Sequence, residues 1–190
     1  MKRTSLAFLS AALTLLWATS SWADPYSDAV ARFKQAGQSA AFFSSSVGFA
    51  VFPTIGKGGI GVGGAHGSGR VYEHGRYVGD ASMNQLSVGW QLGGEAYSQI
   101  IFFRDQQALD NFKSGNFEFG ADVNAVAITA AAGASAGTEG ASAGASGGEK
   151  DARTAGGYYK GMAVFTIVRG GAMYQVAVKG QKFSFTPPPA

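Results

Sequence analysis

The stretch LSVGWQLGGEAYSQIIFF, Leu86–Phe103, decides the fold class. In its first half, Leu86–Gly93, large apolar residues alternate with small or polar ones in strict period two, which is typical of a strand with one buried face. We therefore expect Leu86 and Trp90 to face the core. Gly94 permits a turn, and we expect the second half, Ala96–Phe103, to pair antiparallel with the first.

Shorter apolar runs on both sides of this stretch repeat the strand signal, at 48–52, 60–65, 123–132, 162–168, 173–178 and 183–185. Two segments have helical periodicity, 27–36 and 106–113, the second with Asp105 as its cap. The chain has 29 glycines, and Gly inside a strand usually marks a bend or a close backbone approach. The pattern predicts an α+β fold with a mainly antiparallel, strongly curved or barrel-like sheet and short helices near 27–36 and 105–113.

The N-terminus has the pattern of a secretory signal peptide. Lys2 and Arg3 precede an apolar run at 6–18, and Ser21-Trp22-Ala23 supplies small residues at the positions that a signal peptidase reads. The run is shorter than the roughly 20 residues of a membrane-spanning helix. With no Cys in the chain, a lipid-anchored lipoprotein is not expected. We expect cleavage after Ala23 and a periplasmic protein.

Residues 24–186 are expected to form one domain with a flexible Gly/Ala/Ser insert at 133–150, followed by a tail at 187–190. Removal of the first 23 residues leaves 167 and takes two of the fifteen Lys and Arg, so the net charge falls from +3 to +1. This balance argues against nucleic acid as a partner.

Several motif matches carry no chemistry. Gly59–Gly64 fits G-x-G-x-x-G, but the glycine-rich sequence after it does not begin a helix as a dinucleotide site requires. The G-x-S-x-G matches all fall in the Gly/Ala/Ser tract, outside any strand–turn–helix context. His66 and His74 lack the spacing of metal ligands. We therefore expect no catalysis, no metal and no cofactor.

An ordered series of motifs runs through the chain: GFAVFP at 48–53, GKGG at 56–59, GVGG at 61–64, GSGRV at 67–71, QLGGE at 91–95, ALDNF at 108–112, FGAD at 119–122 and KG at 160–161. This series resembles the SYLF domain family, in its bacterial exported branch, over most of residues 30–185. The resemblance implies a lipid-binding module. Eukaryotic relatives bind phosphoinositides and a yeast relative binds and bundles actin, an activity that we do not transfer to a bacterial envelope.

The chain departs from the family pattern at two places. The sequence Tyr77-Val78-Gly79-Asp80 stands where the family often has Trp, a polar residue and Pro. Arg169 precedes Gly170 where the family usually has an acidic residue, which adds positive charge there.

The candidate lipid contacts are basic residues beside glycine-rich turns. We expect turns to bring Lys57, Arg70 and Arg76 to one rim, where backbone N–H groups and cations bind a phosphate. Phe49 and Phe52 are candidates for apolar insertion, and the run Tyr158, Tyr159 and Lys160 is a second amphipathic candidate. The alternative for these residues is ordinary: core aromatics and solvated surface charges.

Two functions follow. The first is an exported envelope protein that binds the headgroups of anionic phospholipids at a membrane surface, without catalysis. The alternative is a structural or interaction protein of the cell envelope, with a protein partner bound at an exposed sheet edge or at the Gly-rich segment.

Overall fold

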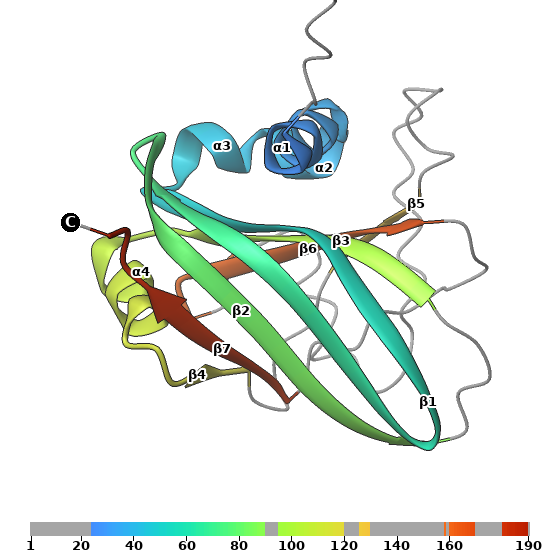
Figure 1. Cartoon of the computed structure of the whole chain (residues 1–190). Helices are drawn as coiled ribbons and strands as arrows, with labels where there is room; N and C mark the ends of the chain where they lie inside the picture. The colour runs from blue at the N-terminus through green and yellow to red at the C-terminus, as the bar shows by residue number, and fades with distance from the viewer. Residues whose placement is uncertain are drawn as a thin grey trace, which may run out of the picture.

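The computed structural model describes residues 24–89, 95–119, 126–129, 158, 160–169 and 180–189. Its strands are β1 (Gly48–Glu73), β2 (Arg76–Gly89), β3 (Glu95–Phe103), β4 (Phe117–Glu118), β5 (Val126–Thr129), β6 (Met162–Arg169) and β7 (Gln181–Thr186). They form one sheet in the order β4-β7-β2-β1-β3-β6-β5, antiparallel except for the parallel pair β5 and β6. The sheet is strongly curled (Figure 1), which confirms the predicted α+β class with a curved, mainly antiparallel sheet.

Helices cover both sides of this sheet. α1 (Pro25–Gln35), α2 (Gly37–Ala40) and α3 (Phe42–Ser45) lie on one face, and α4 (Gln106–Lys113) packs on the other side (Figure 1). The helices expected near 27–36 and 105–113 are confirmed by α1 and α4. α4 begins where the Asp105 carboxylate accepts a hydrogen bond of 3.0 Å from the backbone N–H of Ala108, as an N-cap does.

β1 runs out along the sheet and then back beside itself (Figure 1). Its outgoing part pairs with β3 from Gly48 to Lys57, and its returning part pairs with β2. Glycines allow the two parts to touch: a Cβ added to Gly69 would lie 2.6 Å from the ring of Phe52, and one added to Gly67 would lie 2.6 Å from Ile55. Close backbone approach therefore explains the glycines at positions 67 and 69.

The expected hairpin between 86–93 and 96–103 is wrong. β1 lies between β2 and β3, because both of its parts are long enough to take a neighbour. The buried face expected for Leu86 is also wrong, since its side chain is 85% exposed. The opposite face of β2, with Ala81 and Met83, points into the core.

Two hydrophobic clusters flank the sheet. The inner cluster fills the curl of the sheet and joins α4 to it, through residues that include Phe52, Ala81, Met83, Ile101, Phe103, Leu109, Phe112 and Phe183. The outer cluster seats α1 and α3 on the other face, through residues that include Ala29, Phe33, Phe42, Val51, Ile100, Phe102 and Phe165. Both faces are buried along Tyr97–Phe103 of β3, whereas one face of β2 and of the returning part of β1 is exposed, with His66, Ser68 and Asn84 on it. The surface available for binding therefore lies at the ends and edges of the sheet and on this exposed face.

Some expectations fall outside the described residues: the signal peptide at 1–23, the tract at 133–150, the strand at 173–178, Trp90 and Tyr159. Among the described ranges, no helix is long and apolar enough to cross a membrane.

Candidate functional site

One end of the sheet gathers segments that are far apart in the sequence. The backbone N–H of His74 donates to the carbonyl of Val47 at 2.9 Å, and the N–H of Val47 donates to Phe103 at 2.9 Å. The N–H of Arg104 then donates to the carbonyl of Gly161 at 2.7 Å. These bonds align the β1–β2 turn, the start of β1, the end of β3 and the start of β6 in one row.

Basic side chains stand along this row. Arg76 follows the tight turn His74-Gly75, in which both residues have positive φ, as a two-residue hairpin turn requires. Arg104 directly follows β3, and Lys160 precedes β6 in a second turn with positive φ at Lys160 and Gly161. We call Arg76, Arg104 and Lys160, with the neighbouring Tyr77 and Tyr158, the basic rim. All three cations are exposed.

Carboxylates near the rim are already engaged. Glu73 faces Arg76 across the turn, but its carboxylate lies 3.3 Å from Lys113 of α4. Asp105 lies 3.0 Å from the guanidinium of Arg104. The N–H of Ala108, and then Arg104, hold the pKa of Asp105 below its ordinary value. Within the described ranges, Arg76 has no carboxylate partner, so its charge is available to a ligand.

A row of aromatic rings crosses the sheet next to the rim. Tyr72 stacks on Phe49 with ring centroids 5.0 Å apart, and Phe49 lies 6.1 Å from Phe102. Tyr77 lies 6.2 Å from Tyr72 and is 41% exposed, so the row ends at the surface, where the guanidinium of Arg70 lies 5.8 Å from the ring centroid of Tyr77. The row supports α3 and presents an amphipathic tyrosine to solvent.

Lys57, Arg70 and Arg76 do not share one rim, contrary to our expectation. Lys57 pairs with Glu95 at the start of β3, whereas the basic rim lies at the end of β3. The eight-residue separation along β3 corresponds to about 27 Å, since a strand rises about 3.4 Å per residue. The reason is that β1 turns back beyond Lys57, which places that residue near the far tip of the sheet.

Arg70 is bound within the protein. Its guanidinium lies 3.0 Å from the carboxylate of Asp24 and 4.1 Å from the ring centroid of Tyr26, both at the start of the described chain. Burial lowers the pKa of Arg70, but the hydrogen bond with Tyr72 and the charge of Asp24 outweigh it, so the pKa lies above its ordinary value. Arg70 therefore fastens α1 to the sheet.

The remaining candidates divide between surface and core. Tyr158 is half-buried, with its ring 5.1 Å from that of Phe42 and its hydroxyl 3.3 Å from Ser45 Oγ. Phe49 is half-buried in the aromatic row. Phe52 is wholly buried against Phe183, so its ring cannot reach a membrane in this conformation.

Sequence reasoning missed Arg104 and Tyr77 as members of the rim. Arg104 directly precedes the cap of α4, and Tyr77 follows Arg76, but neither carries a motif. Only the strand order places Arg104 next to the Lys160-Gly161 turn and Tyr77 two strands away at the same end of the sheet, because the row depends on long-range pairing. The only local sequence signals in this region are the glycines of the two turns, in His74-Gly75 and Lys160-Gly161.

The other motif positions have plain structural roles. Gly59–Gly64 lie inside β1, where no helix follows them. His66 bonds to Asn84 through Nδ1 at 2.8 Å. In the part of the chain that the structure describes, no three His, Asp or Glu side chains are grouped as they would be around a metal ion.

Comparison with known proteins gives a family but no individual relative. No curated protein matches the chain. A family model described as Ysc84, Las17-binding protein actin regulator, matches residues 84–186, which is more than half of the chain and spans β2 to β7. This match confirms the resemblance to the SYLF domain family. The chain therefore belongs to the family of Las17-binding protein actin regulators.

Proposed function

We propose that this protein is exported to the cell envelope and binds anionic phospholipid headgroups through the basic rim, without catalysis. The observation that carries the proposal is the alignment of Arg76, Arg104 and Lys160 along one end of the sheet, with Tyr77 and Tyr158 at the same end. Family membership supports a binding or regulatory role.

The chemistry of the rim suits a phosphate-bearing surface. A guanidinium donates two parallel hydrogen bonds to a phosphate. Arg76 and Arg104 favour anionic headgroups over zwitterionic ones because a zwitterionic headgroup carries its own cation, which offsets the charge of its phosphate. Tyrosines such as Tyr77 and Tyr158 have an apolar ring and a polar hydroxyl, which fits the boundary between headgroups and acyl chains. Because the mature chain has a net charge of only +1, its attraction to an anionic membrane must come from the local charges of the basic rim.

Vesicle sedimentation of the mature chain tests the proposal. Phosphatidylcholine vesicles with and without phosphatidylglycerol are compared at several salt concentrations. We expect binding to the anionic vesicles alone, weakening as salt rises, because screening reduces the attraction of exposed charges. Absence of binding to either vesicle would rule out the proposed function.

Matched variants locate the contact. Arg76→Gln and Lys160→Gln should each weaken vesicle binding about fivefold, since a basic residue near an anionic membrane contributes about 1 kcal/mol. Lys57→Gln, at the far tip, and Lys182→Gln, on β7, remove the same charge elsewhere and should have smaller effects. Equal losses in all four variants would show a general charge effect and contradict a specific rim.

A second candidate function is binding of an envelope protein at a sheet edge. β4 pairs with only Lys182 and Phe183 of β7, so Ser184–Thr186 have no strand on that side among the described strands. An exposed strand edge can take up another chain. The test is capture of an envelope protein by the wild type, by Thr186→Pro and by a variant that lacks 133–150. Capture that is lost only in Thr186→Pro would favour this function. Capture that is lost only in the deletion variant would assign binding to the Gly-rich segment.

A further inference from the structure

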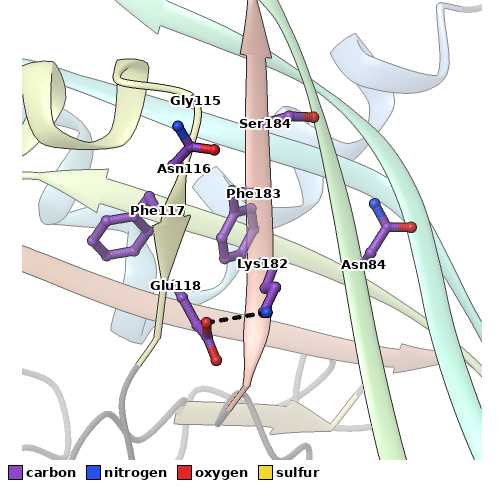
Figure 2. Close-up of a pocket in the computed structure, with 8 residues that line it drawn as sticks. All are labelled: Asn84, Gly115, Asn116, Phe117, Glu118, Lys182, Phe183 and Ser184. Atoms are coloured by element: carbon purple, nitrogen blue, oxygen red, sulfur yellow. Dashed lines mark ion pairs between the residues drawn. The ribbon is translucent and has the colours of Figure 1, made fainter.

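A pocket of about 400 Å³ lies on the exposed face of the sheet where β2, β7 and β4 meet. This volume is within the range of about 300–1,000 Å³ of small-molecule sites. Figure 2 shows side chains from all three strands and from the loop before β4 around it. Its lining is Asn84, Gly115, Asn116, Phe117, Glu118, Lys182, Phe183 and Ser184.

Two polar side chains of the pocket are held in place by neighbours outside it. His66 Nδ1 lies 2.8 Å from Asn84 Oδ1, and Ser82 Oγ lies 2.6 Å from Ser184 Oγ. His66 and Ser82 are the cross-strand partners of Asn84 and Ser184 in the sheet register. Because Asn84 Oδ1 already has a partner, the Nδ2 hydrogens of Asn84 remain as donors toward the pocket.

The pocket is polar without net charge. Lys182 and Glu118 lie 3.6 Å apart and neutralise each other, as the dashed line in Figure 2 marks. Asn116 follows Gly115, whose φ of 81° turns the chain at this point. The pocket therefore combines amide, hydroxyl and carboxylate groups, a set of donors and acceptors that favours a neutral ligand over an ion.

We propose that this pocket binds a neutral carbohydrate, one or two sugar units in size. Adjacent sugar hydroxyls each donate and accept, which matches the donors of Asn84 and the hydroxyl of Ser184. Half-buried Phe117 also lines the pocket and offers an apolar surface for the C–H face of a sugar ring, whereas the ring of Phe183 is buried in the inner cluster. Along β2 the pocket is about 27 Å from Arg76, so it is separate from the basic rim.

Nuclear magnetic resonance of the ¹⁵N-labelled mature chain tests this site directly. Cellobiose and chitobiose are titrated separately, with inorganic phosphate as the charged probe. We expect one of the disaccharides to shift the side-chain amide signals of Asn84 and Asn116 in a saturable way. Shifts with phosphate and with neither disaccharide, or no saturable shift at all, would overturn the proposal.

Substitutions separate the pocket from the rest of the surface. Asn84→Ala should weaken disaccharide binding about tenfold, since it removes hydrogen bonds to the ligand. Asn111→Ala, an exposed asparagine on α4, is the matched control and should bind normally; an equal loss in both would contradict the site. Asn84→Ala should leave vesicle binding unchanged, so the outcome is independent of the proposed lipid function.

Discussion

Gln99 of β3 and Gln181 of β7 exchange two hydrogen bonds across the interior of the curled sheet. The two amides bond to each other at 2.9 and 3.1 Å, and both side chains are fully buried. Gln181 also donates to the hydroxyl of Tyr97 at 3.0 Å, and burial raises the pKa of Tyr97 above its ordinary value. β3 and β7 are not neighbours in the sheet, so this pair joins strands that are held apart by β1 and β2.

Replacement of one member of this pair should destabilise the fold. Gln181→Leu leaves Gln99 and Tyr97 without their partner, and we expect a loss of about 2–3 kcal/mol in the free energy of unfolding, measured in urea, since each unpaired buried polar group costs about 1–3 kcal/mol. The double variant Gln99→Leu/Gln181→Leu should lose less than the sum of the two single variants. Strict additivity would show that the amides do not depend on each other.

Arg70→Ala should loosen α1 from the sheet without affecting vesicle binding. It removes a half-exposed ion pair, worth up to about 1 kcal/mol, and a cation–π contact of about 0.5–1 kcal/mol. We expect faster hydrogen exchange in α1 and a smaller free energy of unfolding, with partial recovery in Arg70→Lys. Weaker vesicle binding at unchanged stability would instead make Arg70 a lipid contact.

Gly69 should not tolerate a side chain. Gly69→Ala places a methyl group 2.6 Å from the Phe52 ring and 2.9 Å from the Val51 carbonyl, and overpacking of this kind costs about 1–3 kcal/mol. Gly58, in the same strand, has open space around its Cα. Gly58→Ala is therefore the control and should change stability by less than about 0.5 kcal/mol. Equal effects on the urea midpoint would mean that the two parts of β1 are not in contact.

The N-cap of α4 should make stability depend on pH. The pKa of Asp105 is lower in the folded protein than in the unfolded chain. The ionised carboxylate therefore stabilises the fold above the ordinary pKa of about 3.9, and this stabilisation is lost as pH falls through the pKa of the folded state. Asp105→Asn keeps an acceptor for Ala108 but has no carboxylate to protonate. The thermal midpoint of the wild type should exceed that of the variant at neutral pH, and the difference should shrink in acid. A difference that stays constant would exclude this linkage.

The two main helices and several strands were predictable because their signals are local, but the strands predicted at 48–52, 60–65 and 86–93 cover only parts of β1 and β2. The α4 helix is defined by the Asp105 cap, the spacing of Ala108, Leu109 and Phe112, and the turn at Gly115, all within eleven residues. Strands β3, β6 and β7 were identified by short apolar runs in the same way. Period-two alternation at Leu86 predicted a strand correctly but not which of its faces is buried, because apolar side chains can also lie on the exposed face of a strand.

The sequence by itself determined the α+β class, the two main helices and the need for close backbone approach at the glycines, since these depend on residues near one another in the chain. Only the tertiary structure decided which strands are neighbours, which face of β2 is buried, and which cations lie at the same end of the sheet or pair with a carboxylate. Arg70 meets Asp24, and Arg76 lies at the same rim as Lys160, through strand pairings that span tens of residues. Such contacts depend on the packing of the whole sheet, and no short motif encodes them.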